Sequence, residues 1–178
     1  MNQICATLLV LCSAFSQPST VYLEVNTQIN EKDMFIHEVT TCAIEHNSML
    51  ESYYRFPIVL VVAQSILESN WGRSRFAVEG NNLFGIKEYD KFEPHLHSID
   101  NNNIMVRKYA NRCESVQDYI HILTHYAIYE SFQTELVRQW FLDDINIYSL
   151  IDELEIYADD INYRNKLKSI VNGLTQVK

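Results

Sequence analysis

The chain has 178 residues, which is enough for one domain with a sizeable core and too few for two comfortable ones. Hydrophobic residues make up 47% and charged residues 21%, with only four glycines and three prolines, a balance that excludes a fibrous or disordered chain. The net charge of −9, with no run of Lys and Arg longer than a pair, argues against a partner made of nucleic acid.

Residues 1–16 predict a secretory signal peptide. Their apolar stretch has the length of a signal-peptide core and falls short of the roughly 20 residues that a membrane span needs. Ala14 and Ser16 supply the small residues of a cleavage site, which leaves a single mature domain over residues 17–178. An uncleaved anchor, a lipoprotein modified at Cys12 and an ordinary buried helix remain alternatives. We expect a secreted or periplasmic protein that touches a membrane only through an uncleaved leader.

Cysteine usage fits an oxidising compartment. Removal of the leader leaves Cys42 and Cys113 as the only possible pair in the mature chain. Two separate buried thiols are the alternative. Neither residue has the CxxC or Cys/His spacing of a zinc site.

A helical pattern opens the mature chain. Apolar residues recur at helical spacing over residues 31–55, which predicts one long amphipathic helix or two short ones. Pro57 marks the start of the next predicted helix, because proline is tolerated in the first turn of a helix. The stretch "IVLVVAQSILESNWG" then stays apolar nearly all round as far as Glu68, as in a helix buried at the centre of a domain, and Gly72 is expected to end it.

The middle of the chain is richer in turn residues. Residues 73–90, "RSRFAVEGNNLFGIKEYD", indicate a structured loop with a helical turn from Ser74 to Val78. Short alternating stretches on either side of "DNNN" predict a β-hairpin over residues 92–109.

Helical periodicity returns after Asn111. The stretch "CESVQDYIHILTHY" predicts a helix that Ser115 or Glu114 caps. Further helices are predicted by "ESFQTELVRQWFL", "NIYSLIDELEIYA" and "NYRNKLKSIVNGL", the last of them ended by Gly173. The sequence therefore predicts a mainly α domain with a small inserted β-hairpin.

Glu68 is the first candidate for chemistry, because it follows a helix that is otherwise buried. Trp71 lies three residues on and so close to the same helical face. Burial against an aromatic ring raises the pKa of a carboxyl group, which lets a glutamic acid serve as a general acid near neutral pH. The alternative is an ion pair of Glu68 with Arg73 or Arg75.

The stretch "AQSILESNWGRSRFAVEGNNLFGIK" is very similar to the signature of glycoside hydrolase family 73. These bacterial β-N-acetylglucosaminidases include flagellar peptidoglycan hydrolases, autolysins and Bax-type proteins. The matching positions are Ala63, Gln64, Glu68, Ser69, Trp71, Gly72, Ser74, Asn82, Leu83, Phe84 and Gly85. A weaker resemblance runs on through "KYANRCESVQDYIHILTHYAIY" and "LEIYADDINYRNKLKSIV", and the whole covers roughly residues 55–172.

This resemblance implies a lysozyme-like helical fold with a substrate groove and an endo-acting hydrolase that cuts the β-1,4 bond after N-acetylglucosamine in peptidoglycan. Glu68 matches the family's catalytic acid. Tyr157, in "IYADD", matches its essential tyrosine, which shapes the site or steadies the N-acetyl group; one more core tyrosine is the alternative. We expect a monomer without a cofactor.

The second carboxylate is less well matched. A glycosidase normally has a base or nucleophile opposite the acid, and in the family it lies on the β-hairpin. Glu93 is the first candidate, because it stands on the first hairpin strand at about the family's distance before Tyr109. Asp100 is the alternative, although it suits a turn. A third possibility is that the N-acetyl oxygen of the substrate acts as the nucleophile.

Substrate contacts are expected from Trp71, Asn82, Phe84, Tyr126 and Tyr129. Asn82 and Phe84 either line the groove or hold its loop, because asparagine side chains bridge backbone groups in such loops. Tyr126 and Tyr129 offer flat faces on which a sugar ring stacks.

The histidines suggest a metal, but weakly. His95 and His97 form H-x-H, and His121 and His125 form H-x-x-x-H, yet no cysteine supports them and nothing in the resembling family matches them. We therefore predict no metal site.

Other functions remain open at this stage. A muramidase or lytic transglycosylase has a similar fold and a single glutamate but cuts after the other sugar. A non-catalytic module that binds or assembles the cell wall is a rival of a different class, and cleavage of the chitobiose core of N-glycans is a third.

Overall fold

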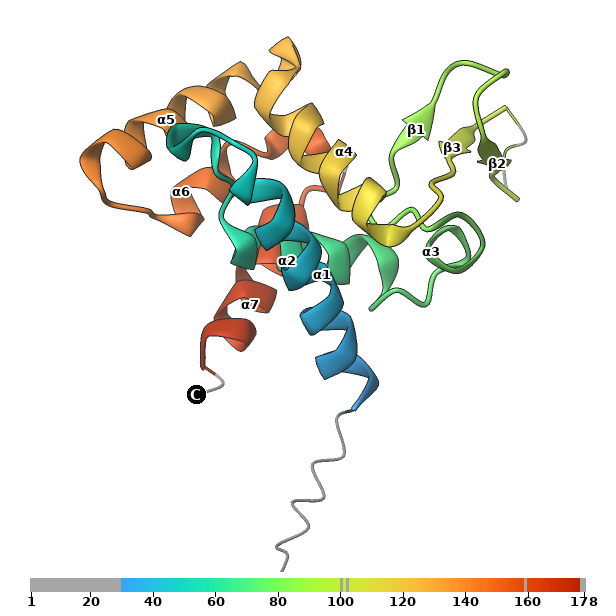
Figure 1. Ribbon diagram of the computed structural model, residues 1–178, viewed down its shortest axis with the longest axis horizontal. Helices are drawn as coiled ribbons and strands as arrows, with labels where there is room; N and C mark the ends of the chain where they lie inside the picture. Colours follow the sequence, from blue (N-terminus) through green and yellow to red (C-terminus); the bar gives the residue numbers. More distant parts are fainter. Residues whose placement is uncertain (1–29, 100, 102, 159, 177–178) are drawn as a thin grey trace, which may run out of the picture.

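The computed structural model describes residues 30–99, 101, 103–158 and 160–176, so the predicted signal peptide lies outside the described residues. Within them the chain forms a mainly helical domain with one small sheet, as predicted (Figure 1). No helix in this part of the chain is both long and apolar enough to cross a membrane.

Helix α2 (Ile58–Ser69) lies at the centre of the domain, with α1 (Glu31–Ser48) and α7 (Tyr163–Gln176) packed against it. Pro57 precedes its first turn, as predicted. Every residue from Leu60 to Ile66 is buried, which explains why the sequence is apolar all round rather than on one face.

A tight left-handed turn follows α2. The helix ends at Ser69, capped by Asn70, rather than at Gly72, and Asn70, Trp71 and Gly72 all have positive φ, of 51°, 62° and 71°. The hydroxyl of Ser69 accepts a hydrogen bond from Gly72 N at 2.7 Å. A Cβ added at Gly72 would lie 2.7 Å from a ring carbon of Phe35, so the close approach of α1 requires glycine here.

The predicted helical turn is helix α3 (Arg75–Gly80), which Ser74 caps. Helix α4 (Arg112–His125) begins one turn earlier than its predicted caps. The side chain of Asn111 caps it by accepting a hydrogen bond from Glu114 N at 3.0 Å, so the prediction of Ser115 or Glu114 was wrong. Ser115 is buried within the first turns of the helix, and its hydroxyl accepts a hydrogen bond from Leu83 N in the neighbouring loop at 3.0 Å.

The predicted hairpin is confirmed as β2 (His95–His97) paired antiparallel with β3 (Met105–Arg107). A further strand, β1 (Lys87–Glu88), pairs with the other edge of β3, which gives the order β1-β3-β2. The sheet lies beside α3 at one end of the molecule, away from α5 and α6 (Figure 1).

Short helices complete the fold. Two α-helices are α5 (Glu130–Leu142) and α6 (Ile147–Asp152), and the 3₁₀ turns are η1 (Ser52–Tyr54), η2 (Ala127–Tyr129) and η3 (Glu155–Tyr157). Helix α7 continues past Gly173, so the predicted end there was wrong: the glycine is exposed in the last turns and keeps a helical backbone.

A disulfide joins Cys42 in α1 to Cys113 in α4, with Cα atoms 5.0 Å apart. The pairing that the sequence left open is therefore formed. It fastens the N-terminal helix to the first turn of α4 and favours an oxidising compartment.

Candidate active site

Glu68 is half-buried in the last turn of α2. Burial raises the pKa of its carboxyl group above the ordinary value, and a hydrogen bond with the side chain of Tyr163 partly opposes this rise. Glu68 therefore keeps its proton to a higher pH than a solvated glutamate does. That property suits a group that has to donate a proton near neutral pH.

The arginines that follow Glu68 are paired with other carboxylates. Arg73 binds Glu31 at 2.7 Å, and Arg75 binds Glu79 at 2.9 Å. The structure therefore does not support the alternative in which an arginine holds Glu68 as an ion pair.

A chain of buried hydrogen bonds lies behind Glu68. The amide of Gln64, one helical turn earlier, accepts a hydrogen bond from the hydroxyl of Tyr119 and donates one to the oxygen of Tyr163 at 2.8 Å. Because the Tyr163 oxygen already accepts from Gln64, its own proton is available to Glu68. Sequence reasoning missed Tyr119 and Tyr163, since only the packing of α4 and α7 on α2 brings them to this point.

Tyr157 belongs to the same aromatic cluster. Its ring stacks on that of Tyr163, with centroids 5.7 Å apart and an interplanar angle of 19°, and its hydroxyl donates to the carbonyl oxygen of Phe84 at 3.1 Å. Burial raises its pKa well above the ordinary value, and the charge of Glu68 adds to this shift. The predicted tyrosine and the predicted acid thus lie within electrostatic reach of each other, with Tyr129 beside them at 6.4 Å between ring centroids.

The loop beside the cluster is held by Asn82. Its amide nitrogen donates to the carbonyl oxygens of Ile86 and Arg107, both at 2.9 Å, and its oxygen accepts from Phe84 N at 3.3 Å and Ile86 N at 3.1 Å. These contacts favour the loop-holding alternative for Asn82. Phe84 is buried and stacks on Tyr119 at 4.0 Å between ring centroids, so it supports the cluster from below the surface.

Two predicted substrate residues contact other ring systems of the protein. Trp71 packs edge-on against Phe35, with centroids 6.4 Å apart, and Lys32 lies 4.6 Å above its ring. We expected Trp71 on the same helical face as Glu68. The helix ends before Trp71, however, and the backbone of Asn70 and Trp71 is left-handed. Tyr126 meets His121 edge-on at 6.1 Å between centroids.

Glu93 is exposed and lies in the turn before β2, two residues short of the strand on which it was predicted. Its backbone N–H donates to the carbonyl oxygen of Asp90 at 3.1 Å. The alternative carboxylate, Asp100, lies outside the described residues.

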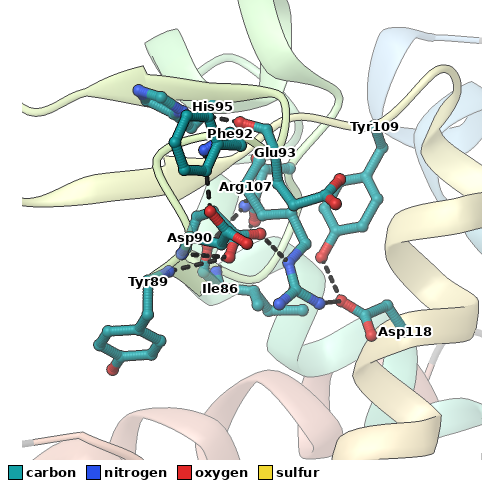
Figure 2. Close-up of polar contacts among 11 residues, drawn as sticks. Ile86, Tyr89, Asp90, Phe92, Glu93, His95, Arg107, Tyr109 and Asp118 are labelled. Atoms are coloured by element: carbon teal, nitrogen blue, oxygen red, sulfur yellow. Dashed lines mark hydrogen bonds and ion pairs between the residues drawn. The ribbon is translucent and has the colours of Figure 1, made fainter.

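A group of charged residues that the sequence did not reveal anchors the sheet to α4 (Figure 2). The guanidinium of Arg107 in β3 donates to Glu88 in β1 at 2.8 Å and to Asp118 in α4 at 2.6 Å, and Tyr109 donates to Asp118 at 2.6 Å. Hydrogen bonds from the backbone N–H groups of Asp90 and Tyr89, together with the one from the Arg107 guanidinium, lower the pKa of Glu88. Glu88 is therefore an ionised structural group and not a second acid.

The substrate groove that the family resemblance implies stays a prediction. Three cavities, of about 550, 480 and 420 Å³, are lined by other parts of the surface, and Glu68 is in none of these linings. The largest of the three is apolar and lies between Phe56 and Trp140.

A half-buried glutamate with a raised pKa, the aromatic cluster near it and the helical fold together suit a glycosidase. Residues 45–176 match the family model of the mannosyl-glycoprotein endo-beta-N-acetylglucosaminidases, so the chain belongs to this glucosaminidase family. This confirms the resemblance found in the sequence. The match excludes most of α1.

Known relatives agree with the family. The chain is 27% identical to the exo-glucosaminidase LytG of Bacillus subtilis (strain 168) over 176 residues, which cover 92% of this chain and 58% of that protein. It thus spans less than two thirds of that relative's length.

Solved structures share the fold. The catalytic domain of the autolysin Auto from Listeria monocytogenes superposes with a TM-score of 0.62 at 24% identity, over 82% of this chain and 85% of that one. The glycoside hydrolase domain of FlgJ from Salmonella typhimurium gives a TM-score of 0.58 at 23% identity, over 82% of this chain and 89% of that domain. These likenesses confirm the expected helical fold.

Proposed function

We propose that the protein is a peptidoglycan hydrolase, an endo-β-N-acetylglucosaminidase that cuts the β-1,4 bond after N-acetylglucosamine in glycan strands. The observation that carries the proposal is the environment of Glu68, a family-matched glutamate that is half-buried near the stacked rings of Tyr157 and Tyr163 and whose pKa is raised by burial. Family membership and relatives named as autolysin and glucosaminidase support the substrate class.

In this proposal Glu68 is the general acid. Its proton passes to the glycosidic oxygen as the bond from C1 of N-acetylglucosamine to that oxygen breaks, so the leaving sugar departs as a neutral alcohol. The hydrogen bond from Tyr163 then stabilises the carboxylate that remains, because a hydrogen bond to the charged form favours it. Gln64 keeps Tyr163 oriented for this task.

Tyr157 is proposed to shape the site. Its hydroxyl is engaged with the carbonyl of Phe84, so it ties η3 to the loop that follows α3. A ring held in this way presents a rigid surface beside Glu68 against which an N-acetyl group is placed. The role therefore lies in positioning the substrate, and the hydroxyl proton stays on the phenol.

Glu93 remains the proposed base or nucleophile. Support comes from its place two residues before the hairpin strand β2, close to the hairpin on which the resembling family carries this group, and from the exposure of its side chain. Nucleophilic attack by the N-acetyl oxygen of the substrate is the alternative mechanism. The two differ in the effect of Glu93→Gln, which abolishes hydrolysis in the first case and leaves most of it in the second.

Two tyrosines are suited to hold the glycan beside Glu68. Tyr129 is half-buried next to Tyr157, and Tyr89, after β1, exposes 84% of its surface and points away from the polar contacts of Arg107 (Figure 2). The two hydroxyls lie close enough to interact electrostatically. Flat apolar faces with a polar edge are the usual surface for a sugar ring.

We also propose that the protein is exported as a monomer and acts outside the cytoplasm. The predicted leader and the disulfide between Cys42 and Cys113 support this location, because disulfides persist in oxidising compartments.

The sugar at the new reducing end tests the activity directly. Purified peptidoglycan is digested, the products are reduced, and their terminal sugar alcohols are identified. N-acetylglucosaminitol is the expected product, whereas N-acetylmuramitol would identify a muramidase, and an anhydro end a lytic transglycosylase. Oligosaccharide products indicate endo cleavage, whereas release of single sugar units would place the protein with its exo-acting relative.

A further inference from the structure

Strand β2 presents two histidines on one of its faces. Side chains alternate along a strand, so His95 and His97 point to the same side and Leu96 to the other. Leu96 packs against Gly80 of α3, where an added Cβ would lie 2.8 Å from its methyl carbon. This contact fixes which face of the strand turns outward, and the two imidazoles share that face.

The two imidazoles converge through the same ring atom. Nε2 of His95 and Nε2 of His97 are in hydrogen-bond contact at 3.3 Å, and the rings meet edge-on, with centroids 4.9 Å apart and an interplanar angle of 88°. Nδ1 of His95 lies 2.7 Å from the carbonyl oxygen of Glu93 (Figure 2). A carbonyl oxygen only accepts, so His95 donates from Nδ1, and in the neutral ring Nε2 carries a lone pair.

The ring of His95 is held in the way that metal-bound histidines usually are. Such a histidine usually donates its other ring N–H to a carbonyl or carboxylate, which fixes the tautomer and the orientation of the ring. Two nitrogens about 2.0–2.1 Å from a tetrahedral zinc ion lie roughly 3.3–3.4 Å from each other. Neighbouring positions of a square-planar site would be nearer, at about 2.9 Å. The observed separation thus matches the edge of a tetrahedron.

Against our expectation from the sequence, we propose that His95 and His97 form a binding site for a tetrahedral divalent transition metal such as Zn²⁺. Within the described ranges, no group of three or more His, Cys, Asp or Glu side chains is placed to hold a metal ion. The pair supplies two ligands of this site. This is an open surface site, weaker than a structural zinc centre and separate from the chemistry proposed for Glu68.

The charges around the pair tolerate a cation. Arg107 is the register partner of His95 across the sheet, but it binds two carboxylates, those of Glu88 and Asp118. Arg75 donates to the backbone oxygen of His97 and is itself paired with Glu79. Each nearby guanidinium is thus matched by at least one carboxylate, so their repulsion of a metal ion is offset.

Titration of the untagged protein with ZnCl₂ near pH 7.5, followed by calorimetry, tests the proposal. We expect one saturable site whose affinity falls at least about tenfold in His95→Ala and again in His97→Ala. MgCl₂ gives no heat of binding, since magnesium prefers oxygen ligands.

His121→Ala and His125→Ala are matched controls. Those two rings stack at 4.3 Å between centroids with an interplanar angle of 29°, so they lie face to face rather than converging on one point. Zinc affinity unchanged in His95→Ala and His97→Ala, or lost only in the control variants, would overturn the proposal, as would an absence of zinc binding to the wild type. Circular dichroism establishes that each variant is folded. The readout is binding alone, so it is independent of whether the protein hydrolyses peptidoglycan.

Discussion

Tyr163 in α7 hydrogen-bonds the carboxyl group of Glu68 at the end of α2, and the same phenol oxygen accepts a hydrogen bond from Gln64 at 2.8 Å. The acid of the proposed reaction is therefore held by a buried chain of polar groups and not by a counter-ion. Burial raises its pKa and Tyr163 limits the rise, so the two effects together set the pH at which the proton is lost.

Tyr163→Phe removes the hydrogen bond that favours ionised Glu68, so the pKa of Glu68 should rise further. The alkaline limb of the pH profile of kcat/KM, which reports loss of the proton from the acid, then moves to higher pH. The free energy of unfolding falls by about 1–3 kcal/mol, because the buried Gln64 amide loses an acceptor. An alkaline limb that does not move would show that Tyr163 does not act on the acid.

Glu68→Gln should stabilise the fold in a pH-dependent way. Folding raises the pKa of Glu68, so the folded state binds the proton more tightly than the unfolded state does. At a pH well below 4.5, the pKa of this carboxyl group in the unfolded chain, Glu68 is protonated in both states. The substitution then does not change the free energy of unfolding. Above the folded pKa the wild type contains a buried carboxylate, whose cost is about 1.4 kcal/mol for each pKa unit.

Urea denaturation at about pH 4 and pH 8 measures this difference. Glu68→Gln should exceed the wild type in stability at the higher pH only, whereas Glu79→Gln, at an exposed ion pair, should change stability little at either. Equal stability of Glu68→Gln and wild type at both pH values would contradict the burial of a neutral acid.

The disulfide should contribute substantially to stability. It closes a loop with a sequence separation of 71 residues, which corresponds to about 4 kcal/mol in the chain-entropy treatment. Cys42→Ser with Cys113→Ser should lower the free energy of unfolding by about this amount, measured in guanidinium chloride. The reduced wild type should match the double variant. A change below about 1 kcal/mol would mean that the packing of α1 on α2 and α4 holds the helix without the bond.

Arg107→Lys should loosen the sheet. A single ammonium group cannot bind Glu88 and Asp118 in the fork geometry of a guanidinium, and the buried carboxylate of Glu88 is left poorly paired. We expect a loss of about 3 kcal/mol in unfolding free energy. Arg73→Lys, at the exposed pair with Glu31, is the control and should cost under about 1 kcal/mol. Similar losses in both variants would argue against an anchoring role for Arg107.

Local patterns of the sequence predicted the framework of the fold. The apolar run before Glu68 identified the central helix, because only a helix surrounded by neighbours is apolar on all sides. The hairpin followed from alternation around a turn. Strand β1 was missed because two residues, Lys87 and Glu88, carry no periodic signal.

Long-range contacts were harder to foresee. Gln64 stood in the recognised motif, but its partners Tyr119 and Tyr163 come from helices far along the chain, and many tyrosines compete for such a role. The cap of α4 was misplaced because Asn111, Glu114 and Ser115 all suit a helix start, and the hydroxyl of Ser115 instead accepts a long-range hydrogen bond from Leu83 N. The contact of Trp71 with Phe35 was not foreseen, because no sequence pattern indicated that the left-handed turn starts directly after Ser69.

The most direct test of the role of Glu68 is the rate at which purified peptidoglycan releases N-acetylglucosamine reducing ends, compared for wild type, Glu68→Gln and the control Glu79→Gln. Removal of a general acid should slow hydrolysis by a factor of about 10²–10⁴ in Glu68→Gln while the fold persists, and Glu79→Gln should match the wild type. Hydrolysis by folded Glu68→Gln at the wild-type rate would contradict the account.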